Sequence, residues 1–186
     1  MGPSDEALAQ LALKEDPDAF AELVNRYQKG IYNLAYRLTG ERDEAQDLAQ
    51  ETFLRAYAAL PSFQTDRRFS PWLYRIATNL CFDYLKRRGR LGTTPIEDFE
   101  AEGAEIPLPD WSMEPARALE RKETQEEVQA AILSLPEKYR AVVILRHIEG
   151  LSYSEMAEVL TLPLGTIKTH LYRARELLKA KLQERG

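Results

Sequence analysis

The sequence predicts an all-α protein in which a flexible acidic linker joins two small helical domains. Apolar residues recur at three- and four-residue steps toward both ends of the chain, which is the period of a helix with one buried side. No segment alternates cleanly between apolar and polar residues, and no hairpin dipeptide is present. Prolines, glycines and acidic residues are concentrated between the two helical parts. We therefore expect domains at residues 1–88 and 116–186, with the linker at 89–115.

Three helices are expected in the first domain. The first covers residues 18–38 and ends at Gly40, because glycine readily adopts the left-handed conformation of a helix end. The second is expected to begin at Asp43, with Gln46 as the return partner of a capping box. The third covers residues 69–88 and carries an apolar stripe that predicts a core-facing side.

A second stripe on this third helix combines aromatic, cationic and amide side chains: Trp72, Arg75, Asn79, Phe82 and Lys86, with Asp83 at its edge. Arg67 and Arg68 precede the helix. Such a face suits single-stranded nucleic acid, because bases stack on rings and phosphates meet cations. A core position for Trp72 and a bridging role for Asn79 are the alternatives.

The linker holds one basic and seven acidic side chains, net −6, whereas the domains before and after it carry −1 and +2. Its prolines stop helices, and its like charges favour an extended chain. Composition alone favours a solvated tether. The alternative is that an acidic extended segment imitates nucleic acid in a basic channel of a partner.

The second domain ends in a predicted helix-turn-helix. Pro136 opens a helix that Gly150 ends, and Ser152 with Glu155 forms a capping box for a short helix. Pro163 then opens a longer final helix. These sizes are typical of the helix-turn-helix, whose second helix reads the major groove.

The final helix has an apolar side and an opposite side that combines bases with an aromatic ring and a hydroxyl: Lys168, Thr169, Tyr172, Arg175 and Lys179. Lys168 and Thr169 are candidate base contacts. Arg146, Arg173 and Lys179 are candidate phosphate contacts, where charge matters more than geometry. His170 lies nearer the apolar side and is expected to pack. The alternative is a solvated charged face in an ordinary bundle.

Composition argues against several other classes of protein. The formal charge of the 186 residues is −5, and Cys81 alone permits neither an internal disulfide nor a cysteine zinc site. We find no phosphate loop, metal cluster or nucleophile–base pair, so we expect no enzyme activity, metal or cofactor. The acidic N-terminus lacks the apolar core of a signal peptide, and apolar runs are too short to insert in a membrane. The expected compartment is the cytoplasm.

Four segments, at residues 47–53, 69–79, 135–140 and 162–169, occur in an order and at a spacing that together resemble one family. The chain resembles an extracytoplasmic-function (ECF, group IV) sigma factor of the bacterial sigma-70 family, and within it the SigW-like type. The resemblance covers about residues 17–88 and 125–182. It implies a sigma region 2 helical bundle, a sigma region 4 helix-turn-helix, and a protein that binds core RNA polymerase and directs it to promoters.

The resemblance also implies roles for individual residues. Core polymerase binding would involve Asp47, Leu48, Gln50 and Glu51. Binding of the −10 element would involve Ser62, Arg67, Arg68, Trp72, Arg75, Asn79, Asp83 and Lys86. Binding of the −35 element would involve Arg146, Thr166, Lys168, Thr169, Tyr172, Arg173 and Lys179. The implied partners are core RNA polymerase, promoter DNA and an anti-sigma factor, which in this family is often membrane-anchored.

Two positions depart from the family pattern. Tyr74, rather than a second tryptophan, stands two residues after Trp72, so the chain has no clear tryptophan pair for strand separation. His170 stands where relatives often have arginine. Two other kinds of protein are compatible with the residues alone. One is a stand-alone dimeric helix-turn-helix regulator, which would bind a palindrome without polymerase. The other is an interaction protein with basic surfaces for an acidic partner.

Overall fold

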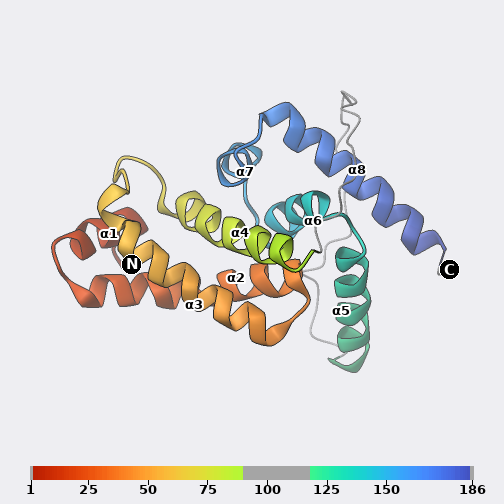
Figure 1. The fold of residues 1–186 in the computed structure, drawn as a ribbon, viewed down its shortest axis with the longest axis horizontal. Coiled ribbons are helices and arrows are strands. Elements are labelled where there is room, and N and C mark those ends of the chain that lie inside the picture. Colours follow the sequence, from red (N-terminus) through yellow and green to blue (C-terminus); the bar gives the residue numbers. More distant parts are fainter. Residues whose placement is uncertain (1, 90–117, 185–186) are drawn as a thin grey trace.

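The computed structural model describes residues 2–89 and 118–184, and every regular element within these ranges is a helix (Figure 1). The predicted acidic linker therefore lies almost entirely outside the described residues. An N-terminal bundle contains α1 (Asp5–Leu13), α2 (Pro17–Thr39), α3 (Arg42–Ala59), a 3-10 turn (Leu60–Ser62) and α4 (Phe69–Arg87). A C-terminal bundle contains α5 (Ala118–Leu133), α6 (Glu137–Val143), a π-helical turn (Ile144–Ile148), α7 (Tyr153–Leu160) and α8 (Leu164–Gln183). The all-α fold class is confirmed.

Local signals explain where the helices of the N-terminal bundle begin and end. Asp16 accepts hydrogen bonds from the first turn of α2, which has Pro17 at its first position, and Gly40 ends this helix with φ of +77°. The capping box predicted at Asp43 is wrong. Helix α3 begins at Arg42, and its N-cap, Glu41, makes no side-chain cap bond. The Glu41 carboxylate instead accepts a hydrogen bond from the Tyr84 hydroxyl of α4 at 3.0 Å.

Helix α1 was not among the predicted elements, and it positions the start of α4. Ser4 caps α1, whose Leu8 and Ala9 are buried against the bundle. The Glu6 carboxylate accepts the backbone N–H of Phe69 at 3.0 Å, so a side chain from α1 satisfies one of the free donors at the N-terminus of α4. The hydrogen bond thus connects the start of α4 to the first turn of α1.

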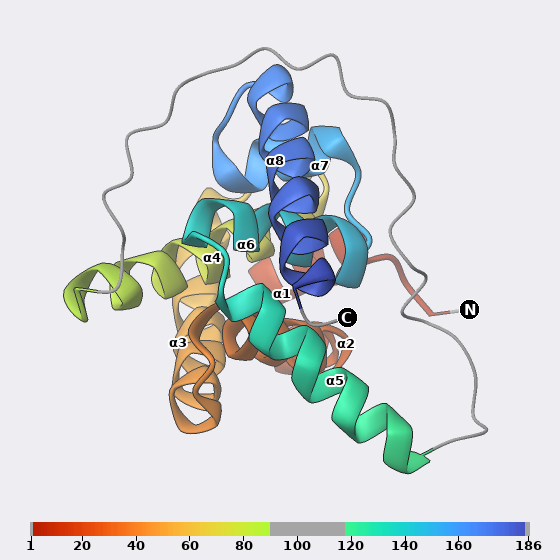
Figure 2. The same ribbon diagram turned by 90° about the vertical axis from the view of Figure 1, so that its right-hand side faces the viewer.

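The C-terminal bundle contains the predicted helix-turn-helix. Ser152 and Glu155 form the reciprocal capping box of α7, as the sequence predicts. Thr161 ends α7 in the left-handed conformation, with φ of +54°, and α8 follows Pro163. Helices α7 and α8 lie next to each other (Figure 2). Helix α6 continues into the π-helical turn, which the sequence did not predict. Here the backbone N–H of Glu149 bonds to the carbonyl of Ile144, five residues back, at 2.9 Å.

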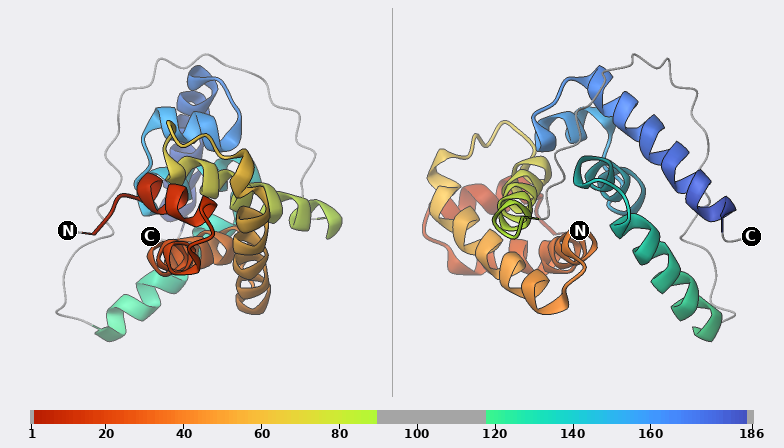
Figure 3. Two further views of the ribbon diagram at one scale, coloured as in Figure 1. Left: turned by 90° about the vertical axis from the view of Figure 1, so that its left-hand side faces the viewer. Right: turned by 45° about the vertical axis from the view of Figure 1, so that its right-hand side comes forward.

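The two bundles pack directly against each other through α4, which contacts α7, and through α2, which contacts α5 and α6 (Figure 3). The Tyr74 hydroxyl donates to the Glu149 carboxylate at 2.8 Å. The Gln129 amide donates to the Tyr36 carbonyl at 3.3 Å. Leu133 lies so close to Gly40 that an added Cβ would come within 2.9 Å of its side chain. A glycine is therefore required there both for its left-handed backbone and for the approach of α5.

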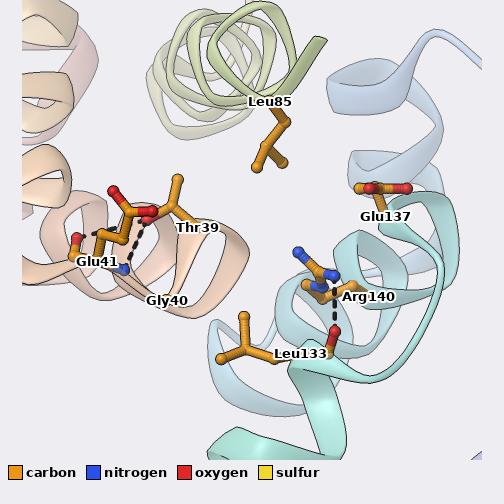
Figure 4. A pocket seen from close by; sticks show the side chains of 7 residues that line it. All are labelled: Thr39, Gly40, Glu41, Leu85, Leu133, Glu137 and Arg140. Atoms are coloured by element: carbon orange, nitrogen blue, oxygen red, sulfur yellow. Dashed lines mark hydrogen bonds between the residues drawn. The ribbon is translucent and has the colours of Figure 1, made fainter. Parts of the chain in front are cut away.

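Arg140 of α6 is the polar centre of this junction. It borders a cleft of about 350 Å³ that is lined from both bundles (Figure 4) by Thr39, Gly40, Glu41, Leu85, Leu133, Glu137 and Arg140. The guanidinium is buried, and it donates to the carbonyls of Leu38 in α2, Leu133 at 2.8 Å and Leu135 at 3.0 Å. Burial lowers the pKa of Arg140, and the Glu137 carboxylate opposes this shift. One side chain thus links α2 to the turn between α5 and α6.

Replacing Arg140 with leucine should lower the free energy of unfolding by about 3 kcal/mol, because three carbonyls lose their donor at roughly 1–3 kcal/mol each. Chemical denaturation measures this change. The matched control is Arg87→Leu, which removes the same charge from an exposed position at the end of α4. Equal, small effects of the two substitutions would contradict the role given to Arg140.

Candidate polymerase and nucleic-acid interfaces

The residues predicted to bind polymerase lie on two sides of α3. Asp47 and Gln50 are exposed, and Glu51 is half-exposed in an ion pair with Arg55 at 3.0 Å. Leu48 is only 8% exposed, so its side chain belongs to the core of the bundle. The exposed face therefore offers carboxylate and amide groups, while Leu48 helps to hold the helix that carries them.

Two large apolar residues on α3 were not among the predicted site residues. Leu54 is 63% exposed and Tyr57 is 61% exposed. Both follow the acidic segment and lie off the buried stripe of Ala45, Ala49 and Ala56. A helical wheel could have found both positions, because they fall outside the buried apolar stripe of this helix.

The predicted −10 face is an exposed surface of α4. Arg75, Asn79, Asp83 and Lys86 are all exposed. Among the described residues, neither Arg75 nor Lys86 forms an ion pair. The face therefore carries two cations and an amide with donors available to a ligand, on a helix whose other sides are packed.

Trp72 lies at the edge of this face rather than fully outside the core. The ring is half-buried, and its centroid lies 5.0 Å from that of Phe63 and 5.6 Å from that of Phe69. Neighbouring Ser62 is exposed, and its hydroxyl donates to the Ala59 carbonyl at 2.6 Å. The structure thus combines both interpretations of Trp72: it packs on one side and leaves part of the ring accessible.

The two arginines before α4 have different surroundings. Arg67 is exposed. Arg68 forms an ion pair and a hydrogen bond with Glu155, the capping-box residue of α7. Most of the Arg68 side chain is still exposed, so solvent screens the pair. One predicted −10 contact is therefore engaged with the helix-turn-helix in this arrangement.

The predicted −35 face lies along α8. Lys168 and Lys179 are exposed, whereas Thr166, Thr169, Tyr172 and Arg173 are half-exposed. The Thr169 hydroxyl donates to the Gly165 carbonyl at 3.0 Å, which leaves its oxygen free to accept a bond. His170 is buried, and its ring meets Tyr139 edge-on with centroids 5.4 Å apart. The prediction that His170 packs is confirmed.

Arg146 reaches this region from the π-helical turn. Its guanidinium donates to the Leu151 carbonyl at 3.0 Å and lies 4.6 Å from the centroid of the Tyr153 ring. These contacts fix its orientation at the start of α7. The hydrogen bond to Leu151 uses only one of the N–H groups of the Arg146 guanidinium.

The described residues form two helical bundles, one with an exposed cationic and amide face on α4 and the other with a helix-turn-helix, an arrangement typical of a nucleic-acid-binding protein. A search against protein families matches residues 23–91 to sigma-70 region 2 and residues 125–178 to sigma-70 region 4. The chain is 41% identical to the ECF RNA polymerase sigma factor SigW of Bacillus subtilis, over 92% of each protein. It is 40% identical to the RNA polymerase sigma-H factor of Pseudomonas aeruginosa, over 96% of this chain and 94% of that one.

The chain belongs to the ECF sigma factors of the sigma-70 family, as the sequence motifs predicted. It is thus an RNA polymerase sigma factor that directs transcription initiation, and it is not an enzyme in its own right.

Solved structures share this fold. The fold matches CnrH in its complex with the cytosolic domain of CnrY, with a TM-score of 0.75, 28% identity and coverage of 99% of this chain and 100% of that one. It also matches the sigma factor RpoE of Bartonella quintana, in complex with the anti-sigma factor NepR, with a TM-score of 0.64 and 24% identity. Among the described residues, no helix is long and apolar enough to span a bilayer, and no cluster of side chains suits a metal ion.

The contact between Tyr74 and Glu149 predicts how the two bundles are held together. Burial raises the pKa of Glu149, while the Tyr74 hydroxyl and the Arg37 charge oppose this shift. Tyr74→Phe leaves the half-buried Glu149 carboxylate without its donor, at a cost of roughly 1–3 kcal/mol. We expect the bundles to separate more often, which small-angle scattering detects as a larger radius of gyration. Tyr57→Phe, the same change at an exposed tyrosine, is the control; identical scattering from the two variants would contradict the prediction.

Proposed function

We propose that this sigma factor binds promoter DNA with two separate surfaces, α4 at the −10 element and α8 at the −35 element. Core polymerase sets the distance between the two surfaces. The observation that supports this most directly is the pair of exposed cationic faces on two different bundles. Each surface alone is expected to bind DNA weakly, because the net charge of the chain is −5. When polymerase fixes their separation, the second contact becomes intramolecular and the combined affinity rises by orders of magnitude.

We assign polymerase docking to Asp47, Gln50 and Glu51, with Leu48 supporting their helix from the core. At the −10 element, Arg67, Arg68, Arg75 and Lys86 would meet phosphates. Trp72 and Asn79 would hold an unstacked base, with Ser62 and Asp83 at the edge of the face. At the −35 element, Lys168 and Thr169 would contact bases, with Thr166 and Tyr172 beside them. Arg146, Arg173 and Lys179 would contact phosphates.

The docked arrangement is proposed as a resting form that has to open for this task. The support is the pairing of Arg68 with Glu155, because the α7 carboxylate competes with a −10 phosphate for the same guanidinium. Residues 89–115 would then act as the tether between domains 1–88 and 116–186. Their charge suits a path along the basic, nucleic-acid-binding surface of polymerase.

A protein regulator is proposed as a further partner. The support is the match to CnrH, which was solved with the cytosolic domain of CnrY. We expect an anti-sigma factor of this kind, with a membrane anchor outside the part that binds, to cover the polymerase and DNA faces of this chain. Its site of action would be the cytoplasm, where polymerase and promoter are found.

Run-off transcription with purified core polymerase tests the proposal. The chain plus core should start RNA at defined promoters, whereas the chain alone should bind the same DNA weakly at moderate salt. Tight, specific binding of a palindrome by the chain alone would instead favour a stand-alone dimeric regulator.

The base contacts on α8 make a separate prediction. Lys168→Ala and Thr169→Ala should each reduce discrimination between the correct and a scrambled −35 element by ~1–3 kcal/mol, because a base-edge contact is lost. Binding of holoenzyme to both DNAs measures this difference. Equal losses on the two DNAs would show that these residues contact phosphate only.

Asn79 of α4 should act when the promoter DNA melts, after the closed complex has formed. Asn79→Ala should impair open-complex formation more than closed-complex binding, because unstacked bases exist only after melting. Permanganate reactivity of the −10 thymines reports melting, and a footprint unchanged by the substitution would refute the role. Gln28→Ala, at an exposed polar position of α2, is the control.

A further inference from the structure

The start of α4 is capped by a residue of α1 and not by its own loop. Arg68, the N-cap residue of α4, makes no side-chain cap bond within the described residues. The Glu6 carboxylate instead accepts the backbone N–H of Phe69 at 3.0 Å, from 63 positions away in the chain. A helix is usually capped by the residue just before it. A cap from a separate helix therefore also fixes where α4 begins relative to α1.

Helix α1 is itself anchored on α2 through Asp5, the residue before Glu6. The half-buried Asp5 carboxylate accepts hydrogen bonds from the Tyr27 hydroxyl and, at 2.9 Å, from the Arg26 guanidinium. The Tyr27 ring in turn packs on Phe69, with centroids 5.7 Å apart. Two adjacent carboxylates of α1 thus connect α2 to the first residue of α4.

The position of Phe69 determines the geometry of the loop before α4. Phe63 and Phe69 are buried at the two ends of this loop, with ring centroids 5.7 Å apart, and Trp72 packs on both rings. Residues 64–68 between them are exposed or half-exposed. Helix α1 contacts both the 3-10 turn that precedes the loop and α4 that follows it (Figure 3). The conformation of the loop and the accessible edge of Trp72 therefore depend on support from α1.

We propose that Glu6 is a positioning residue for the unpaired −10 strand: it holds the loop at 63–68 and the Trp72 ring in the geometry that receives unstacked bases. This inference rests on the proposed function and adds a residue that acts through Phe69, without touching DNA. A surface that is already ordered before binding loses less conformational entropy when the bases arrive, so its affinity is higher.

Charge and positioning predict opposite effects of removing Glu6. A carboxylate repels the phosphates of nucleic acid, so its loss would by charge alone strengthen DNA binding. Loss of the bond to Phe69 would loosen the loop and weaken binding of the unpaired strand. A weaker complex would therefore report the positioning role and not the missing charge.

The test measures binding of holoenzyme to the single-stranded −10 segment of a promoter that the wild-type holoenzyme transcribes. Glu6→Ala should weaken this binding roughly tenfold, about the effect of losing a helix cap. The salt slope should not change, because no cation is lost. Binding to a −35 duplex should be equal to that of the wild type. Glu6→Gln should restore most of the affinity, because its amide oxygen can still accept the Phe69 N–H.

The matched control is Asp16→Ala, which removes a capping carboxylate elsewhere in the same bundle. Asp16 accepts the backbone N–H groups of Asp18 at 3.0 Å and Ala19 at 3.4 Å in the first turn of α2. Both alanine variants should lower the Tm to a similar extent, but only Glu6→Ala should lose affinity for the −10 strand. Equal losses of affinity would make Glu6 a residue of general stability and overturn the proposal. A loss that Glu6→Gln does not restore would also overturn it, because the bond to Phe69 would not be the cause.

The two levels of inference fail differently. If wild-type holoenzyme does not bind the single-stranded −10 segment, the proposed function is wrong. If it binds and Glu6→Ala binds equally well or better, only the positioning role of Glu6 is wrong.

Discussion

Helix α4 is buried along two stripes, and the second stripe is what joins the two halves of the molecule. Leu73, Ala77 and Leu80 close the core of the N-terminal bundle. Tyr74, Thr78, Cys81 and Leu85 are equally buried on a neighbouring stripe, where Tyr74 meets Glu149 and Leu85 meets the cleft beside Arg140. Only the remaining side of the helix, with Arg75, Asn79 and Lys86, is left for nucleic acid. Docking of the helix-turn-helix thus leaves the −10 face exposed and engages only the loop before it.

The composition of this junction suits a contact that opens. It contains a tyrosine hydroxyl, a carboxylate, an amide and a guanidinium, and the buried Thr78 hydroxyl has no hydrogen-bond partner among the described residues. Polar groups regain water when such an interface separates, so opening costs less than it would for an apolar surface of the same area.

The sequence predicted those features that depend on local signals. Gly40, the Ser152 capping box and the Pro163 helix start each follow from the conformational preferences of a few neighbouring residues. The capping box predicted at Asp43 is absent because α3 begins one residue earlier, after Glu41. The Glu41 side chain bonds to Tyr84 of α4, a partner 43 residues away. Helix α1 is short and its buried stripe is brief, and the π-helical turn is a shift in backbone bonding that side-chain periodicity does not report.

The candidate site was predictable to the same extent. The exposed positions of Asn79 and Lys168 follow from helical spacing, and so does the buried ring of His170. Leu48 was grouped with the polymerase contacts because of its neighbours in the motif, although its spacing matches the apolar stripe. The pairing of Arg68 with Glu155 joins residues 87 positions apart and depends on how the bundles dock, which no local pattern encodes.

The distance between the two bundles, measured by paired labels, tests the central claim most directly. Gln28→Cys on α2 and Glu176→Cys on α8 place labels at exposed positions, while the native Cys81 is buried and inaccessible. The account predicts one short distance in the free chain and one longer distance in the complex with core polymerase and promoter DNA. An unchanged short distance in an actively initiating complex would contradict it.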